Sequence, residues 1–255
     1  MASVAVSMQL FALDGIPLIK PGDELAALIV EALQSSQLSL QNGDVLVLAQ
    51  KIVSKSENRY VTLSSSDPSA RAQKLARICN KDARLVEIIL GESRAVVRAR
   101  RDVLIVEHRL GFVLANAGVD ASNVGDEGRV LLLPIDPDGS SQALCRALSI
   151  ASGVEIGVLI NDSWGRAWRM GTIGSAIGLA GVPGVEDLRG KADLFGRILR
   201  SSELAVADEL ASAASLVMGQ AGEGHPVVLV RGFPYALRES SAAELVRPRS
   251  LDLFR

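Results

Sequence analysis

The sequence VEIGVLINDSWGRAWR spans residues 154–169 and places a short apolar run directly before a polar, glycine-containing segment. A run as short as Ile156–Ile160, bounded by polar and glycine residues, predicts a buried strand rather than a helix. Asp162 and Ser163 would then lie at the end of that strand, where the following turn exposes them for chemistry. The alternative is an Asx-turn that closes the strand, with solvated arginines nearby, and this segment alone does not decide between the two.

Length, hydrophobic content and net charge limit the kinds of protein that this chain can be. The chain has 255 residues, of which 48% are hydrophobic and only 4% aromatic. This length supports one large domain or two closely packed lobes around a core of Val, Leu, Ile and Ala. The net charge of −2 gives no reason to expect nucleic acid or an anionic membrane as a partner.

Cysteine usage and the N-terminus bear on the cellular compartment. Cys79 and Cys145 fall in apolar helical patterns without metal-ligand spacing, which predicts buried reduced thiols. Residues 1–8 lack the charged start and long apolar core of a signal peptide. No apolar run approaches the roughly 20 residues that span a bilayer. We therefore expect a cytoplasmic protein.

Hydrophobic periodicity predicts alternating helices and strands. The expected helices begin after Asp23, with Leu25, Leu28, Ile29 and Leu33 on one face, and continue with Ser69–Cys79, Arg84–Leu90, Ser140–Ser152 and Ser202–Met218. The expected strands are Val45–Ala49, Ala95–Ala99, Val103–Glu107, Gly111–Leu114, Arg129–Leu133, Ile156–Ile160 and Val227–Val230. Successive strands without an intervening helix favour antiparallel ribbons, so we predict a mixed α/β (α+β) fold with largely antiparallel or mixed sheets and packed helices.

Two helix starts carry recognisable capping signals. Asp67-Pro68 is expected to open the helix at Ser69, and Asp138 to cap the helix at Ser140. The glycines of 170–184 and 184–192 match neither the dinucleotide-binding nor the P-loop spacing.

Two irregular segments are candidates for ligand contact. Residues 115–123 are small and polar, and such a loop is costly to order unless something binds there. The glycines of 218–226 free backbone N–H groups to face a phosphate chain. Because this loop follows a helix C-terminus, a cation or lysines would have to compensate. Lys51 and Lys55 could each reach a phosphate, although ordinary solvent-exposed lysines are the simpler interpretation.

Six groups of motifs then occur in order along the chain. They are GIPLI at 15–19; GDVLV at 43–47 with QKIVSK at 50–55; NAGVDASN at 116–123; LPIDPD at 133–138; NDSWGR at 161–166 with WR at 168–169; and ADELA at 207–211 with VMGQ at 217–220. Together they resemble the coenzyme F420-0:L-glutamate ligase (F420:γ-glutamyl ligase) family, from about Phe11 to Phe254. The chain length implies the stand-alone form without the nitroreductase-like domain of bifunctional members.

The resemblance implies an enzyme, organisation and cofactors. The enzyme is a GTP-dependent ligase that joins L-glutamate to the deazaflavin precursor F420-0 and then adds γ-linked glutamates. It is implied to be an intimate homodimer, with residues 1–246 as the ligase domain of one or two lobes and 247–255 as a C-terminal tail. Two divalent cations, magnesium or manganese, are implied at the nucleotide, and a monovalent cation is a further expectation.

The resemblance also assigns site residues. Asp120 and Asp162 correspond to the ligands of one cation, and Ser163 and Gln220 to those of the other. The family usually has threonine where this chain has Ser163, and serine keeps the hydroxyl with a less fixed rotamer. Trp164 replaces a less bulky residue of many relatives, which bears on the shape of the pocket. The implied GTP contacts are Ile16, Pro17, Leu18, Ile19, Gln50, Lys51, Lys55, Asn123, Met218, Gly219, Gln220, Ala221, Gly222, Glu223, Gly224 and His225.

The chemistry explains these residue types. An amide forms only after the carboxylate is activated, here by phosphoryl transfer from GTP to give an acyl phosphate. Two anionic reactants repel each other unless hard cations neutralise them, and no protein nucleophile is required. Asp120, Asp162 and Arg166 are therefore the candidate catalytic residues, with Arg166 as a clamp for a phosphate or carboxylate. The alternative for Arg166 is a structural ion pair with Asp136 or Asp138.

Two alternative functions are considered beside the ligase. A metal-dependent nucleotide phosphohydrolase would keep the cation site but use water as the acceptor. A non-catalytic nucleotide-binding dimer would need neither Asp120 nor Asp162, and both are present.

Overall fold

The computed structural model describes residues 6–125 and 128–253, and a five-stranded sheet lies at its centre. The sheet order is β1 (Gln9–Ala12), β12 (Val227–Arg231), β2 (Val45–Ala49), β8 (Gly157–Gly165) and β9 (Thr172–Ala180). β2 and β8 are parallel and every other neighbouring pair is antiparallel. The predicted mixed α/β class with mostly antiparallel pairing is confirmed.

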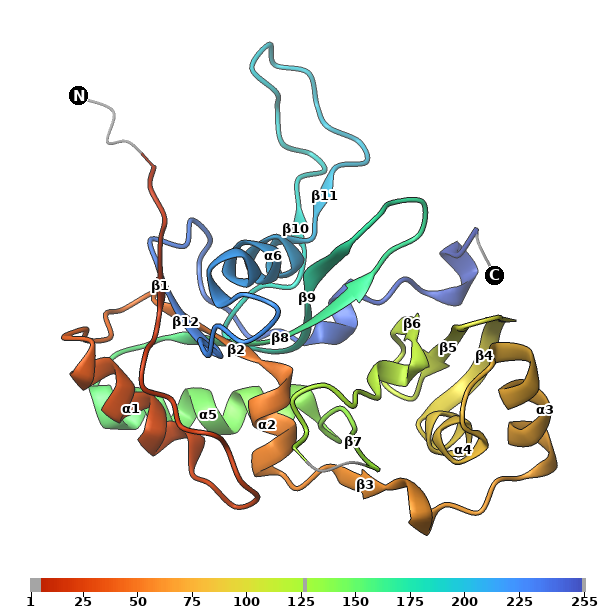
Figure 1. Ribbon diagram of the computed structural model, residues 1–255. Coiled ribbons are helices and arrows are strands. Elements are labelled where there is room, and N and C mark those ends of the chain that lie inside the picture. Colours follow the sequence, from red (N-terminus) through yellow and green to blue (C-terminus); the bar gives the residue numbers. More distant parts are fainter. Residues whose placement is uncertain (1–5, 126–127, 254–255) are drawn as a thin grey trace, which may run out of the picture.

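Helices cover both faces of this sheet. α6 (Val206–Met218) lies above it in Figure 1, while α1 (Leu25–Ser35), α2 (Gln50–Ser56) and α5 (Pro137–Ser152) lie below. The buried face of α6 carries alanines, and these small side chains let the helix approach β9 closely. β2 and β12 at the centre of the sheet are buried except at their last residues, and the main core is mostly aliphatic.

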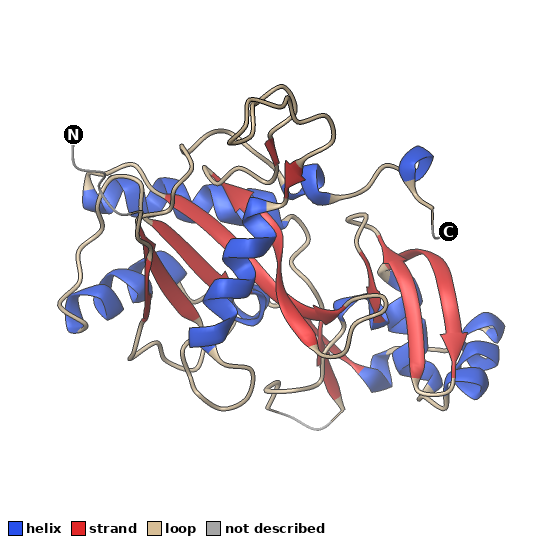
Figure 2. Cartoon of the chain, turned by 90° about the horizontal axis from the view of Figure 1, so that it is seen from above, coloured by secondary structure: helices blue, strands red, loops and turns tan. Residues whose placement is uncertain are grey.

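A smaller lobe stands to one side of the sheet (Figure 2). It contains α3 (Ala70–Cys79), α4 (Ala83–Gly91) and the antiparallel strands β4 (Ser93–Arg100), β5 (Val103–His108) and β6 (Val113–Ala115). Its buried apolar residues form a cluster separate from the main core. The antiparallel pair β3 (Tyr60–Thr62) and β7 (Arg129–Leu131) lies between the lobe and the main body.

The remaining elements are short. The two-residue strands β10 (Glu186–Asp187) and β11 (Glu203–Leu204) form the base of a long arm that projects from the body in Figure 1. Short 3-10 turns are η1 (Leu63–Ser65), η2 (Asn116–Gly118), η3 (Ala242–Leu245) and η4 (Arg249–Leu251). Within the described ranges no helix has both the length and the apolar character needed to cross a membrane.

Several predicted boundaries need correction. The strand Val45–Ala49 is confirmed at both ends, but the residues after it form α2, which was not predicted. The helix expected from Ser202 begins at Val206, because Glu203 and Leu204 pair with β10 instead. Both cysteines are free thiols, and Cys145 is only partly buried.

Both predicted caps are wrong by two residues. Ser69 caps α3 by accepting a hydrogen bond from the Ala72 amide at 3.2 Å. Asp136 caps α5 by accepting one from the Gly139 amide at 3.0 Å, since Pro137 is favourable in the first turn and starts the helix earlier. Asp138 therefore lies inside the first turn of α5.

The carboxylate of Asp138 ties three elements together. It accepts hydrogen bonds from the Leu179 amide of β9 at 2.8 Å, the Ala242 amide at 3.0 Å and the Ser241 hydroxyl at 2.7 Å. Asp138 thus fixes α5 to β9 and to η3 rather than serving as a helix cap.

The strand predicted to end at Ile160 continues to Gly165. β2 ends at Ala49, which pairs with Asn161, while β9 goes on pairing with β8 as far as Gly165. Asp162 and Ser163 therefore lie within a strand, on a section of β8 that has a neighbour on one side only. The predicted strand end was therefore wrong for β8, which continues to Gly165, but correct for its neighbour β2, which ends at Ala49.

A glycine on β9 allows close contact with α5. A Cβ atom added at Gly178 would stand 2.4 Å from the Pro137 carbonyl oxygen. We predict that Gly178→Ala lowers the free energy of unfolding by about 1–3 kcal/mol, because backbone must shift to accommodate the methyl group. Urea denaturation measures this change. Gly165→Ala is the matched control, since a Cβ there meets open space, and equal losses in both variants would contradict the close approach.

Candidate functional site

A cavity of about 550 Å³ lies beyond the carboxyl end of β2. Its wall comes from the loop before α1, the first turns of α2, the loop after η2, the unpaired edge of β8 and the loop after α6. Every residue predicted to contact GTP or a cation lines this cavity. The structure therefore brings together motifs from most of the length of the chain.

Arg166 is the one predicted site residue that does not line the cavity. It follows the last residue of β8, and its Nη1 atom is buried without a hydrogen-bond partner in the described structure. The proposed pairing with Asp136 or Asp138 is wrong, because their carboxylates serve the start of α5, β9 and η3. Trp164 also lies outside the cavity lining and packs against Phe112, with ring centroids 5.6 Å apart.

Asp120 is held by a lysine and a serine. Lys51 Nζ lies 2.8 Å from Asp120 Oδ2 and also donates to the Ser122 hydroxyl at 2.7 Å. The Ser122 amide donates to Asp120 Oδ1 at 2.7 Å. Burial raises the pKa of Asp120, but the hydrogen bonds from Lys51 and Ser122 outweigh that effect and lower it. Asp120 is therefore a carboxylate at neutral pH.

Fewer interactions offset the burial of the Asp162 carboxylate than that of Asp120. Burial raises its pKa to about 6, and the nearby Asp120 carboxylate adds to the increase. Opposing this are a hydrogen bond from the Ser163 amide, at 2.8 Å, and the charge of Lys51. An under-compensated carboxylate beside a second carboxylate is a position that a bound cation would stabilise.

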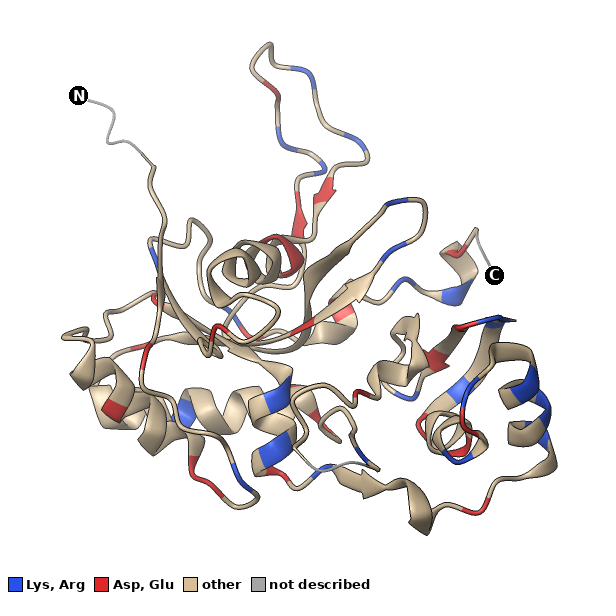
Figure 3. Ribbon diagram, in the orientation of Figure 1, with Lys and Arg blue, Asp and Glu red and all other residues tan. Residues whose placement is uncertain are grey.

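The positive charge of the cavity comes from α2. Lys51 and Lys55 are one helical turn apart, so they share a face, and both line the cavity. Figure 3 shows basic segments on α2. Burial lowers the pKa of Lys55, and the charge of Lys51 lowers it further. Both lysines thus belong to the cavity wall, and Lys51 is paired with Asp120.

The loop after α6 owes its course to glycine. Gly219 (φ +76°) and Gly224 (φ +78°) adopt left-handed backbone angles that disfavour other residues. Asn123 Nδ2 donates to the Ala221 carbonyl at 3.5 Å, which links this loop to the one after η2.

A further link joins the glycine loop to the segment before α1. His225 Nε2 lies 2.8 Å from Asp14 Oδ1. The loops around the cavity thus hold one another in place.

The donor set around the cavity fits hard cations. Asp120, Asp162, Ser163 and Gln220 offer two carboxylates, one hydroxyl and one amide oxygen to the same cavity. In the part of the chain that the structure describes, no cluster of three or more His, Cys, Asp or Glu residues forms a metal site. A magnesium ion suits such a sparse set, because it usually keeps waters and shares phosphate oxygens.

Sequence reasoning missed one polar residue of the cavity wall. Asn161 lines the cavity, is only 4% exposed, and its Oδ1 has no hydrogen-bond partner among the described residues. It stands next to Asp162 in the motif, and that position was the available signal.

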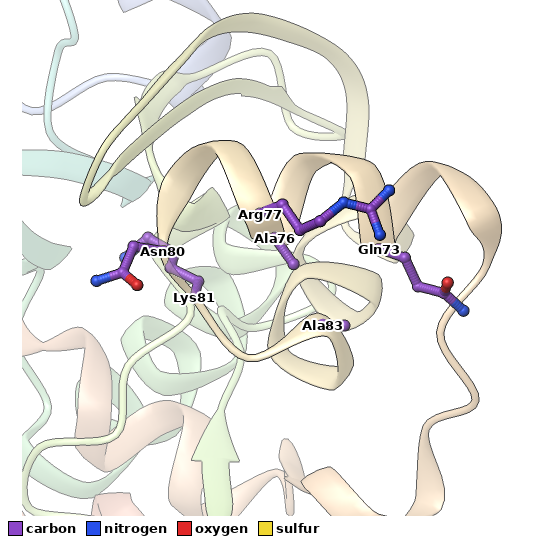
Figure 4. Close-up of a pocket in the computed structure, with 6 residues that line it drawn as sticks. All are labelled: Gln73, Ala76, Arg77, Asn80, Lys81 and Ala83. Carbon is purple, nitrogen blue, oxygen red and sulfur yellow. The ribbon is translucent and has the colours of Figure 1, made fainter.

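An open depression of about 480 Å³ on α3 and α4 contains none of the predicted residues. Figure 4 shows its lining, which is Gln73, Ala76, Arg77, Asn80, Lys81 and Ala83. This lining has no carboxylate, so it lacks the chemistry of the cavity beside β8.

The fold and the cavity together are those of a mixed α/β protein with a polar site where carboxylates, lysines and a glycine-containing loop meet. Residues 15–232 match the family model described as F420-0:gamma-glutamyl ligase. The chain belongs to this family, which confirms the resemblance found from the motifs.

Curated relatives agree with the family assignment. The chain is 46% identical to a protein of Methanothermobacter thermautotrophicus over 98% of this chain and 100% of the relative. It is 46% identical to one of Methanopyrus kandleri over 93% of both. It is 42% identical to one of Archaeoglobus fulgidus over 97% of this chain and 96% of the relative. Each is named coenzyme F420:L-glutamate ligase.

The environment of Asp162 predicts a stability cost. A carboxyl group whose pKa rises from about 4 to about 6 on folding destabilises the folded state at pH 7 by about 1–3 kcal/mol. We predict that Asp162→Asn stabilises the protein by this amount at pH 7 in chelator. The advantage should shrink as the pH falls from about 6 towards 4, where wild-type Asp162 becomes protonated.

Urea denaturation at both pH values measures this. Asp138→Asn is the control, and it should destabilise, because that carboxylate accepts several hydrogen bonds. An Asp162→Asn variant less stable than the wild type at pH 7 would contradict the electrostatic argument.

Proposed function

We propose that this protein is a GTP-dependent ligase of coenzyme F420 biosynthesis, which forms an amide between L-glutamate and F420-0 and then adds γ-linked glutamates. One observation carries the proposal. Asp120, Asp162, Ser163 and Gln220 meet beside two lysines in one cavity, in a chain whose relatives are named coenzyme F420:L-glutamate ligase.

The reaction has two steps. A carboxylate oxygen of F420-0 attacks the γ-phosphorus of GTP, the bond from that phosphorus to the β–γ bridging oxygen breaks, and GDP leaves. The amine of glutamate then attacks the acyl carbon of the resulting acyl phosphate. The bond from the acyl carbon to oxygen breaks, inorganic phosphate leaves with the electron pair, and the amine proton passes to phosphate or water. No cysteine or histidine has to act as a nucleophile.

The residues of the cavity divide this work. Lys51 and Lys55 attract the triphosphate, and the backbone of 219–225 surrounds it. Asp120, Asp162, Ser163 and Gln220 would hold two magnesium or manganese ions, which would neutralise charge on the two anionic reactants. Before a cation binds, the Lys51 ammonium group partly fills that role at Asp120.

Arg166 suits the acceptor rather than the nucleotide. It lies outside the cavity, and its buried Nη1 has no partner in the described structure. A guanidinium group binds carboxylates and phosphates through paired hydrogen bonds. We therefore assign Arg166 to an acidic group of F420-0.

The test is to incubate the purified protein with F420-0, GTP, magnesium and glutamate and to read the product masses. We expect F420-0 to gain glutamyl residues, with GTP turnover that requires both F420-0 and glutamate. Asp162→Ala should abolish turnover while leaving the circular dichroism spectrum unchanged. GTP hydrolysis without glutamate would favour a phosphohydrolase, and nucleotide binding without turnover would favour a binding protein.

A homodimer is part of the proposal, and the projecting arm supports it. Every residue from 189 to 198 is exposed, and the apolar tip residues Leu194 and Phe195 are 99% and 95% exposed. Backbone hydrogen bonds join the two sides of the arm to each other, such as that from the Gly190 amide to the Leu199 carbonyl at 2.9 Å. Burial of such a tip against a second copy of this chain would stabilise the arm.

We predict that replacing both Leu194 and Phe195 with Asp weakens the dimer at least ~100-fold, because buried apolar anchors dominate interface energy. Sedimentation velocity across a concentration series measures this. Ile150→Asp on α5 is the control, since that side chain is also exposed, at 84%. A double variant that sediments as the wild type would remove the arm from the interface.

A further inference from the structure

The wall of the cavity includes a buried side-chain oxygen, Oδ1 of Asn161, that has no assigned role. We infer that Asn161 is an additional cation ligand, whose carboxamide oxygen acts together with Ser163 and Gln220. This inference rests on the cation site of the proposed function. It adds a ligand that neither the motifs nor the family resemblance assigned.

The first observation is a buried hydrogen-bond acceptor without a partner among the described residues. Asn161 is 4% exposed and lines the cavity, yet its Oδ1 has no hydrogen-bond partner within the described residues. A carboxamide oxygen can only accept hydrogen bonds, so its partner has to be a hydrogen-bond donor or a cation. A buried polar atom left without either has a cost in folding free energy. The structure keeps this cost at the wall of the proposed site.

The second observation is orientation. Asn161 Nδ2 donates to Ser215 Oγ at 3.0 Å and approaches Met218 Sδ at 3.9 Å, and both partners belong to α6. Because these contacts hold the NH₂ group against α6, the oxygen on the other side of the carboxamide is held in a fixed direction. A preset ligand loses little side-chain entropy when it binds.

The third observation is the alternation of side chains along β8. Asn161, Asp162 and Ser163 pair in regular succession with Ala176, Ser175 and Gly174 of β9. Successive side chains of a strand point to opposite faces, so Asn161 and Ser163 share a face and Asp162 points to the other.

Other contacts agree with this division. A Cβ added at Gly174, the partner of Ser163, would meet Ser215 Oγ at 2.3 Å, so this face is the one covered by α6. Asp162 instead feels the charges of Asp120 and Lys51. Asn161 therefore belongs with Ser163 and with Gln220, which follows the end of α6, rather than with the two aspartates.

The chemistry of the two faces then differs. One face offers carboxylates, and the other offers three neutral oxygens from an amide, a hydroxyl and a second amide. Neutral oxygens hold a hard cation without cancelling its charge. A cation on the Asn161 face keeps more of its positive charge for the anionic reactants.

The test is a manganese titration of the full chain in the presence of GDP, followed by electron paramagnetic resonance of free Mn²⁺. We expect wild type to bind two ions. Asn161→Ala should weaken one of the two by about 10–100-fold. Asn161→Asp, which keeps the oxygen but loses the NH₂ group, should bind both ions at least as tightly as wild type.

This pair of variants separates a ligand from a structural residue. If the Nδ2 contacts with α6 were what mattered, Asn161→Asp would weaken manganese binding as much as Asn161→Ala, and the inference would be wrong. Affinities of both variants within about twofold of wild type would also overturn it. Should the alanine variant fail to fold, a loss of affinity in Asn161→Asp alone overturns the inference.

Ser215→Ala is the matched control. It removes the partner of Nδ2 and leaves Oδ1 in place, so both ions should still bind with less than threefold loss. The readout also separates this inference from the ligase proposal. Two manganese ions bound by a wild type that makes no product would defeat the ligase proposal alone. A wild type that binds fewer than two ions with GDP would defeat the inference.

Discussion

The site depends on one geometric constraint, which is that β2 ends at Ala49 while its parallel neighbour β8 continues to Gly165. Beyond Asn161, β8 keeps β9 on one side and leaves its other edge free. The chain that leaves β2 turns at once into α2, which carries two lysines to this edge. A single early strand end therefore creates both the opening and its positive wall.

Electrostatic balance follows from that opening. Asp120 is compensated by Lys51 and Ser122, whereas Asp162 has little compensation and its pKa rises to about 6 as a result. Burial also makes the charge of Lys55 costly, and its pKa falls. The site thus holds opposite charges that its own geometry leaves imperfectly paired, which is typical of functional sites. Charged ligands would complete the pairing.

Much of this was predictable from the sequence, and the errors share a cause. Short apolar runs and motif order located β2 and every polar residue of the cavity wall except Asn161, because strand burial and backbone-ligand contacts leave local signals. Tertiary contacts decided the rest. Asp138 was predicted to cap a helix, but its carboxylate accepts hydrogen bonds from β9 and η3. β8 extends beyond its apolar run because β9 continues to pair with it. No local sequence pattern predicts that Arg166 lies outside the cavity.

The two carboxylates come from different hydrophobic cores. Asp162 belongs to β8 in the main core, whereas Asp120 follows Val119, which is buried in the smaller lobe. The backbone of Asp120 pairs with Leu131 of β7, through hydrogen bonds of 3.0 and 2.8 Å. Cations shared between the aspartates would link the two cores directly. Since ligands that bind only the folded arrangement stabilise it, cation and nucleotide binding would also fix the lobes relative to each other.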